Sequence, residues 1–186
     1  MTTDLTRDLD ERLADLLKRV TDWLLFAESK NTGIVGLIST VLGLIVSFSL
    51  FGPPLPSLAR VGLAVGALLL MISLAIVVIS FLPVTDLERS LAGNHDPPGP
   101  GDNLLYYGHL ARYEPQALVQ AVASMYVEVT PDEVAACKRA SDLAAQIVTN
   151  ARIIVRKLAL YRAALLLYGA GVLFAAAAIA LAAFLE

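Results

Sequence analysis

Three long stretches of this 186-residue sequence contain no Asp, Glu, Lys, Arg or His. They cover residues 31–59, 61–85 and 163–185. Each exceeds the roughly 20 residues that cross about 30 Å of hydrocarbon as an α-helix. Hydrophobic residues make up 57% of the chain, which is more than the core of one soluble domain of this size needs. The sequence therefore predicts an integral membrane protein with three transmembrane helices.

The basic residues are distributed unevenly around these stretches. Five of the fourteen Lys and Arg residues precede the first stretch, eight lie between the second and the third, and only Arg60 separates the first two. Cytoplasmic segments of membrane proteins are enriched in Lys and Arg next to the spans. This pattern predicts that the N-terminus and residues 86–162 are cytoplasmic, whereas the turn before Arg60 and the C-terminal Glu186 lie outside.

The N-terminal segment, residues 1–30, has the periodicity of an amphipathic cytosolic helix. Its apolar residues recur at spacings of three and four and are Leu5, Leu9, Leu13, Leu16, Leu17, Val20 and Leu24. Because no proline precedes Pro53, this helix is predicted to continue into the first span, at about residues 33–52. The second span is predicted at about residues 61–83, so residues 31–85 form a transmembrane hairpin.

Residues 86–162 are predicted to form a cytosolic helical sensor region. A loop rich in Pro and Gly follows Pro83, and a short helix begins near Glu114 and Pro115. This helix carries the apolar residues Leu118, Val119, Val122 and Met125. No segment shows the alternation of a β-strand, so the predicted fold class is all-α.

The last helix has the clearest start in the sequence. Residues 130–133 combine a capping box with proline at the first helical position. No proline follows Pro131, so this helix is predicted to be long and to continue unbroken from the cytosol through the third span, residues 163–186. Its cytosolic part has an apolar seam of Leu143, Ile147, Ile154, Leu158 and Tyr161. We expect the N-terminal helix to pack on that seam.

Each predicted span contains a row of small residues at a spacing of four. The rows are Ser39, Gly43 and Ser47 in the first span, Gly62 and Gly66 in the second, and Gly171 and Ala175 in the third. Such rows allow helix backbones to approach closely in lipid. Two interpretations remain open, because a row can form an interface between subunits of a homo-oligomer or pack within one three-helix bundle.

No group of residues in the sequence has the spacing of a catalytic or metal site. The histidines His95 and His109 and the single cysteine, Cys137, match no zinc-binding pattern. Residues 33–52, 61–83 and 163–185 of the predicted spans contain no acidic or basic residue, which argues against an ion-coupled transporter. The net charge of −3 argues against nucleic-acid binding. We therefore expect no enzyme activity, no metal, no cofactor and no nucleic-acid partner.

Five residues are candidates for binding a small ligand. Arg152 and Arg156 are one helical turn apart with Lys157 beside them, which is suited to a phosphate group. The alternative is that they anchor the third span at the cytoplasmic surface. Tyr106 and Tyr107 are suited to stacking on a base. The alternative for both tyrosines is a place in the core or at the membrane interface.

Four short motifs resemble those of a known family. An Ala-acidic-x-Lys step at residues 27–30 precedes the first span, with Glu28 where Asp is more usual. An Asn-apolar-aromatic-Gly segment at residues 103–108 follows the second span. Gln146 and a Lys-x-x-x-x-Arg step at residues 157–162 precede the last span. In this arrangement, which extends over nearly the whole chain, the sequence resembles the transmembrane effectors of bacterial Pycsar anti-phage systems.

The resemblance implies a multi-pass protein of the bacterial inner membrane that works with a pyrimidine nucleotide cyclase. In such systems the cyclase is stimulated by infection and makes cyclic CMP or cyclic UMP. The effector senses the nucleotide and impairs the membrane, so that the cell dies or stops growing before the phage matures. The ligand site is then expected on the helices and loops of residues 86–162, between subunits of a homo-oligomer in the lipid bilayer.

A second interpretation is a membrane scaffold that no small molecule gates. Its cytosolic helices would recruit a protein partner through the apolar seam of the last helix. Only the first interpretation predicts a response to a cyclic nucleotide, so that response distinguishes the two.

Overall fold

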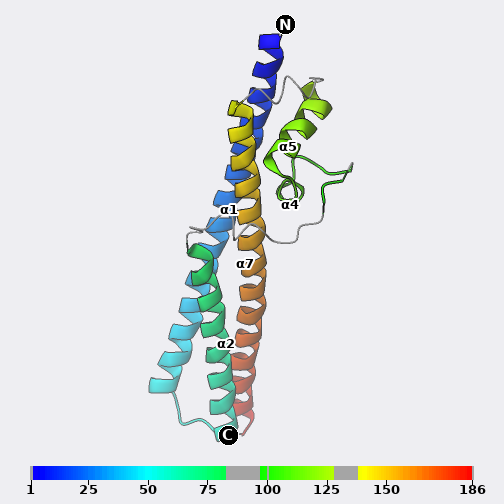
Figure 1. Cartoon of the computed structure of the whole chain (residues 1–186). Helices are drawn as coiled ribbons and strands as arrows, with labels where there is room; N and C mark the ends of the chain where they lie inside the picture. Colours follow the sequence, from blue (N-terminus) through cyan, green and yellow to red (C-terminus); the bar gives the residue numbers. More distant parts are fainter. Residues whose placement is uncertain (1, 83–96, 100, 128–137, 186) are drawn as a thin grey trace. The chain divides into compact units, whose positions relative to one another are not determined.

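The computed structural model describes residues 2–82, 97–99, 101–127 and 138–185. The helices are α1 (Thr2–Phe51), α2 (Ser57–Phe81), α4 (Tyr107–Leu110), α5 (Pro115–Val122) and α7 (Lys138–Leu185), and a π-helical turn, η1 (Ala123–Val127), follows α5 (Figure 1). No strand occurs in these described ranges, and the prediction of an all-α fold is confirmed.

Three helices, α1, α2 and α7, are long and apolar enough to span a membrane. As predicted, α1 runs unbroken for 50 residues and ends at Phe51, just before Pro53. α2 has 25 residues. α7 has 48 residues in the described part of the chain, so the last helix is long and continuous, as predicted. Its predicted start at residues 130–133 lies outside the described residues, as do His95, Cys137 and most of the loop after the second span.

The chain divides into two compact units. The first consists of Met1–Ala27 and Val84–Arg156, and the second consists of Glu28–Pro83 and Lys157–Glu186. Both α1 and α7 contribute residues to each unit. The amphipathic part of α1 thus belongs to the first unit, and its apolar part belongs to the second.

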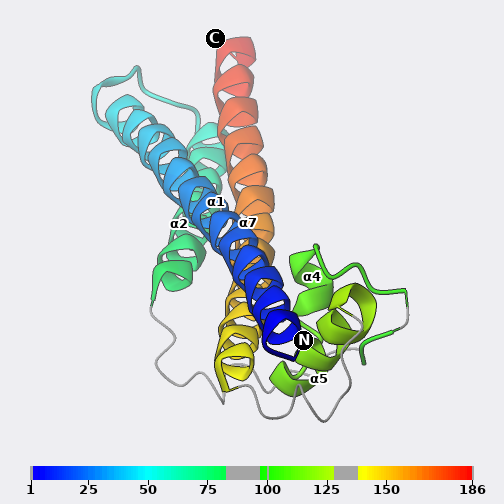
Figure 2. The ribbon, with the colours of Figure 1, turned by 90° about the horizontal axis from the view of Figure 1, so that it is seen from above.

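In the first unit, the amphipathic part of α1 lies beside the first turns of α7, and α4 and α5 pack against them (Figures 1 and 2). The buried side chains of this core include Leu9, Leu13, Leu16 and Val20 of α1, Leu110 of α4, Leu118 and Val122 of α5, and Ile147 and Ile154 of α7. An ion pair of 3.6 Å between Asp10 and Arg139 also joins α1 to α7. Within this unit, the predicted packing of the N-terminal helix on the seam of the last helix is confirmed.

The short helix predicted near Glu114 and Pro115 is α5, and its apolar residues have different environments. Leu118, Val119 and Val122 are buried, but Met125 is 48% exposed. The chain changes from α-helix to the π-helical turn η1 at Ala123. A π-helical turn contains more residues than an α-helical turn, so Met125 is rotated off the buried face.

In the second unit, α2 and α7 approach each other closely where their small residues meet. A Cβ atom at Gly66 would lie 2.8 Å from the carbonyl oxygen of Gly171 and 3.1 Å from the amide nitrogen of Ala175. A Cβ atom at Gly62 would lie 2.8 Å from Cβ of Ala178. The small-residue rows of α2 and α7 thus pack against each other inside the chain.

The small-residue row of α1 has a different environment. Ser39, Gly43 and Ser47 are all exposed. A Cβ atom at Gly43 would meet no atom of the described residues within 4 Å. This face of α1 is therefore accessible to lipid or to a second subunit.

Candidate functional site

In the first unit, Arg152 joins α7 to the segment between α4 and α5. Its Nε donates to the carbonyl oxygen of Ala111 at 2.9 Å, and its Nη2 donates to the carbonyl oxygen of Tyr113 at 3.0 Å and to Glu114 Oε1 at 2.9 Å. The side chain of Arg152 is only 12% exposed, whereas that of Glu114 is 75% exposed. Because the guanidinium holds its donors in a fixed fork, one residue fixes two main-chain carbonyls that follow α4.

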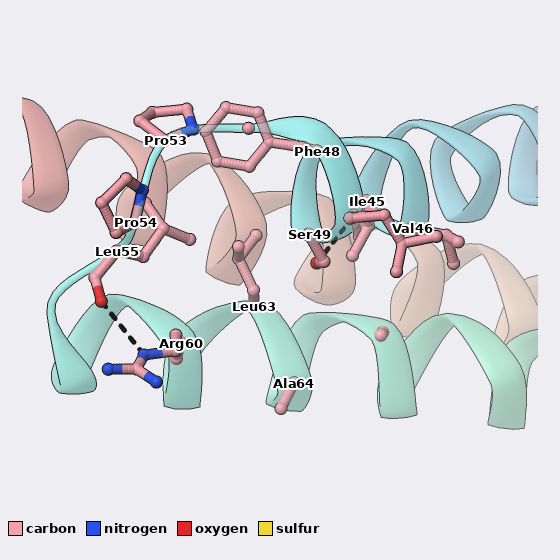
Figure 3. Close-up of a pocket in the computed structure, with 13 residues that line it drawn as sticks. Ile45, Val46, Phe48, Ser49, Pro53, Pro54, Leu55, Arg60, Leu63 and Ala64 are labelled. Carbon is pink, nitrogen blue, oxygen red and sulfur yellow. Dashed lines mark hydrogen bonds between the residues drawn. The ribbon is translucent and has the colours of Figure 1, made fainter.

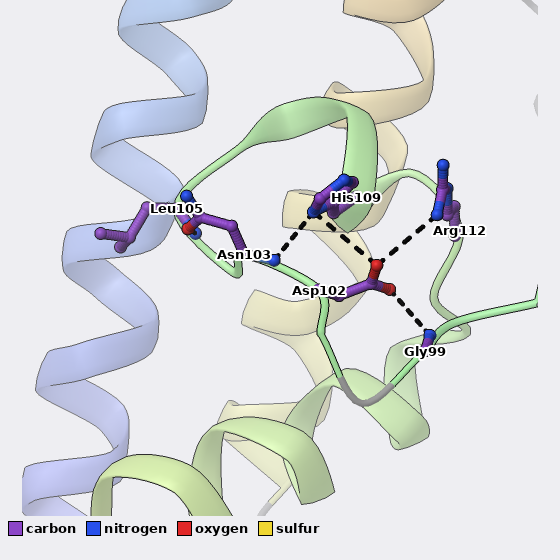
Figure 4. A network of polar contacts seen from close by, with 6 residues as sticks. All are labelled: Gly99, Asp102, Asn103, Leu105, His109 and Arg112. Atoms are coloured by element: carbon purple, nitrogen blue, oxygen red, sulfur yellow. Dashed lines mark hydrogen bonds and ion pairs between the residues drawn. The ribbon is translucent and has the colours of Figure 1, made fainter.

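The carboxylate of Asp102 is the centre of a polar network on the same segment (Figure 4). It accepts a hydrogen bond of 3.0 Å from the amide of Gly99 and lies 3.5 Å from Nη1 of Arg112. Burial and the negative charge of the neighbouring Asp102 raise the pKa of Tyr113 above its usual value. The side chain of Asp102 is only 6% exposed, so this buried carboxylate is compensated by the amide of Gly99 and the guanidinium of Arg112.

The motif segment that begins at Asn103 is folded by its own polar groups (Figure 4). The side-chain oxygen of Asn103 accepts from the amide of Leu105 at 2.9 Å, which is the geometry of an Asx turn. The amide of Asn103 donates to Nδ1 of His109 at 2.8 Å. A nitrogen that accepts this bond carries no proton, so the 3.7 Å separation of the same Nδ1 from Asp102 is not an ion pair.

Five aromatic side chains of the first unit form a cluster, in which Phe26 meets Trp23 edge-on at 5.6 Å. The ring of Tyr107 lies between Tyr106, at 4.6 Å, and Trp23 of α1, at 5.3 Å. His109 meets the Tyr106 ring edge-on at 5.2 Å. Burial and the neighbouring Tyr106 raise the pKa of Tyr107 to about 12, so its hydroxyl is neutral at physiological pH. Trp23 was not among the predicted site residues, although it is the only tryptophan in the sequence.

A shallow groove of about 150 Å³ opens on the first unit. Two cations of α1, Arg12 and Arg19, line it together with Asp15 of the same helix, Leu105 of the motif segment and Tyr126 of η1. Arg12 and Arg19 are seven residues apart, which is two helical turns, so they share one face of α1. Nε of Arg12 also lies 3.7 Å from the carboxylate of Asp8. The groove therefore combines two guanidinium groups and one carboxylate with an aromatic ring and an exposed apolar side chain.

In the second unit, the first and last motifs meet in an ion pair. Nζ of Lys157 donates to Glu28 Oε1 at 3.2 Å, and the side chain of Lys157 is only 15% exposed. Nζ of Lys30, the last residue of the first motif, lies 5.8 Å from the ring centroid of Tyr161. The contacts explain why acidic and basic residues occur at these motif positions, since each charge has a partner on the other helix.

Two hydrogen bonds between apolar helices also stabilise the second unit. Nδ2 of Asn31, which is fully buried, donates to Oγ of Ser80 at 2.8 Å. The hydroxyl of Ser73 donates to the carbonyl oxygen of Ala164 at 2.7 Å. These bonds join α1 to α2 and α2 to α7, as polar side chains commonly do between transmembrane helices. The Oδ1 atom of Asn31 has no partner among the described residues.

The family of the Pycsar effector protein domain matches residues 12–184 of the chain. The chain is a Pycsar effector. Family membership gives it the role of an effector in anti-phage defence, and the family is one of effectors and not of known enzymes. Its three apolar helices are consistent with a membrane effector. No curated protein and no solved structure matches the chain.

The predicted ligand residues of this Pycsar effector have different surroundings. Arg152 is engaged by the segment after α4, and Lys157 is engaged by Glu28 in the second unit. Arg156 is exposed, and Tyr106 and Tyr107 belong to the aromatic cluster. Among the residues that the structure describes, no three His, Cys, Asp or Glu side chains are placed to hold a metal ion.

We expect the ion pair between Glu28 and Lys157 to stabilise the second unit of the Pycsar effector measurably. A double-mutant cycle with Glu28→Gln and Lys157→Met should give a coupling energy of about 1 kcal/mol in thermal unfolding of the detergent-solubilised protein. The value is modest because Glu28 is 46% exposed. The control is the same cycle on the pair of Arg7 and Glu11, whose side chains are 78% and 65% exposed. A coupling energy no larger than in the control would contradict the expectation.

Proposed function

We propose that this Pycsar effector is triggered by cyclic CMP or cyclic UMP from a partner pyrimidine nucleotide cyclase, and that it then impairs the bacterial inner membrane. The outcome is abortive infection, in which the infected cell dies or stops growing before the phage matures. The observation that carries the proposal is the family match over residues 12–184, which includes all three helices apolar enough to span a membrane. The distribution of Lys and Arg supports a cytoplasmic N-terminus.

The groove beside Arg12 and Arg19 is the best candidate for the nucleotide. A cyclic nucleotide carries one negative phosphate and a flat base, so it requires a cation and an aromatic or apolar surface. The groove supplies both, with Tyr126 as the aromatic residue. Arg152 is less suited to this task, because its donors are already bound to main-chain carbonyls and Glu114.

Gating then follows from a difference in nucleotide affinity between two arrangements of a homo-oligomer. Changing the ratio of the active to the resting arrangement from 1:99 to 99:1 requires the nucleotide to bind the active one more tightly by about 5.5 kcal/mol. Several symmetric sites share this difference in binding free energy. The nucleotide site lies on α1, and the same helix contributes its apolar part to the second unit. A change in the packing of α1 in the first unit can therefore be transmitted along this continuous helix to its apolar part in the second unit.

We expect purified protein in dye-loaded liposomes to cause leakage when a pyrimidine cyclic nucleotide is added, and not with cyclic AMP or cyclic GMP. Replacing Arg12 and Arg19 together with alanine should raise the nucleotide concentration for half-maximal leakage by about tenfold or more, because two cations that bind phosphate are lost. The measurement is dye release against nucleotide concentration at a fixed protein-to-lipid ratio.

The matched control removes two positive charges from α1 outside the groove, with Arg7→Ala and Lys18→Ala. An equal loss of sensitivity in this control would contradict the groove as the site while leaving the trigger intact. If no nucleotide causes leakage from liposomes with confirmed insertion, the trigger is wrong. The membrane scaffold that recruits a protein partner is then the better interpretation.

A further inference from the structure

A second and larger groove, of about 630 Å³, lies in the second unit where α1 ends and α2 begins (Figure 3). Its walls are apolar side chains of both helices and of the turn between them, such as Phe48, Leu55 and Leu63. Arg60 is the only charged residue among those that line it. A cation at one side of an apolar groove between membrane helices is the combination that an acidic lipid requires.

Arg60 has hydrogen-bonding capacity that the described residues do not use. Its Nε donates to the carbonyl oxygen of Leu55 at 3.0 Å, which holds the guanidinium beside the turn. Figure 3 shows its two terminal nitrogens extending past this bond. Arg60 forms no ion pair with any acidic residue in the described part of the chain, and it is the only ionisable residue in residues 31–85.

The start of α2 adds positive potential at the same place. The first main-chain hydrogen bond of this helix runs from the amide of Arg60 to the carbonyl oxygen of Pro56 at 3.1 Å. The amides of the preceding residues of α2 therefore have no acceptor within the helix, and Pro56 offers no side-chain cap. The positive end of the helix dipole thus lies beside the guanidinium.

We propose that this groove binds an acidic glycerophospholipid, whose phosphate contacts Arg60 and whose acyl chain lies along the apolar wall. A phosphatidylglycerol headgroup fits better than phosphatidylethanolamine. The groove lining contains no carboxylate that would receive an ammonium group, so only the negative part of the headgroup finds a partner. The proposal concerns the resting protein and does not depend on which nucleotide triggers it.

The test uses the full-length protein in vesicles of phosphatidylethanolamine and phosphatidylglycerol that contain a trace of phosphatidylglycerol with a photoreactive acyl chain. After irradiation, adducts are mapped by mass spectrometry. We expect adducts to concentrate in residues 45–67, and unlabelled phosphatidylglycerol should compete better than phosphatidylethanolamine. Arg60→Ala should lower labelling there by about tenfold, because the phosphate loses its cation.

A second variant blocks the acyl chain without changing charge. Ala64 lines the groove, so Ala64→Trp should also lower labelling, whereas Ala75→Trp on an exposed position of the same helix should not. Both variants are compared with the wild type for helix content and for elution as a single species in detergent. Labelling that is spread evenly over all three helices and is independent of Arg60 would mean an unspecific lipid shell only.

Discussion

Gly66→Leu is expected to disrupt the packing of α2 on α7 and to abolish the effect of this Pycsar effector on membranes. A Cβ atom at this position would lie 2.8 Å from the carbonyl oxygen of Gly171, 3.1 Å from the amide nitrogen of Ala175 and 3.3 Å from its Cβ. Two of these neighbours are backbone atoms, which cannot rotate away as a side chain would. Overpacking of a core by a few methylene groups already costs about 1–3 kcal/mol, and a leucine adds four carbon atoms here.

The measurement is the temperature at which the protein loses its single elution peak in detergent, together with nucleotide-triggered dye release. The matched control is Gly43→Leu in α1, since a Cβ atom at Gly43 would meet no described atom within 4 Å. We expect the control to unfold at nearly the wild-type temperature. Equal destabilisation by both substitutions would contradict the close approach of α2 and α7.

Gly43→Leu also tests whether the exposed row of Ser39, Gly43 and Ser47 contacts a second subunit. If the variant keeps its thermal stability but loses oligomerisation and dye release, this face of α1 is an interface of the homo-oligomer. If it retains both, lipid covers the face.

The three rows of small residues show a property of the fold that the sequence did not predict, namely which helix covers each row. Their spacing is the same in the sequence, yet among the described residues only the rows of α2 and α7 pack against a partner helix. Spacing along one helix defines a face, but it does not specify which helix covers that face. The continuity of α1 was predictable for a different reason, because no proline precedes Pro53, just before which the helix ends.

The ligand residues were less predictable, because spacing along one helix does not specify which distant residues its side chains contact. Arg152 was chosen because it lies one turn from Arg156, but its acceptors, such as Ala111, are about 40 residues away in the sequence. The groove of Arg12 and Arg19 depends on Tyr126, which belongs to a distant segment. The sequence shows that Arg12 and Arg19 are seven residues apart, but this spacing does not indicate that Tyr126 lies beside them.

Arg152→Ala is expected to destabilise the first unit by about 2–4 kcal/mol. The substitution leaves the carbonyl oxygens of Ala111 and Tyr113 without their donor, and these residues are only 2% and 5% exposed. Each buried polar group without a partner costs about 1–3 kcal/mol. Arg152→Lys should rescue only part of this loss, because an ammonium group cannot reproduce the fork of the guanidinium.

Trp23 provides the measurement, because the only tryptophan of the chain lies in the first unit. Its fluorescence in guanidinium chloride should show an earlier transition for Arg152→Ala. Glu114→Gln is the control, and it should shift the transition little, because Glu114 is 75% exposed and the bonds to the two carbonyls remain. If Arg152→Ala instead leaves the transition unchanged and removes the nucleotide response, Arg152 binds the ligand. The groove at Arg12 and Arg19 would then not be the complete ligand site, since the phosphate would require a cation of α7 as well.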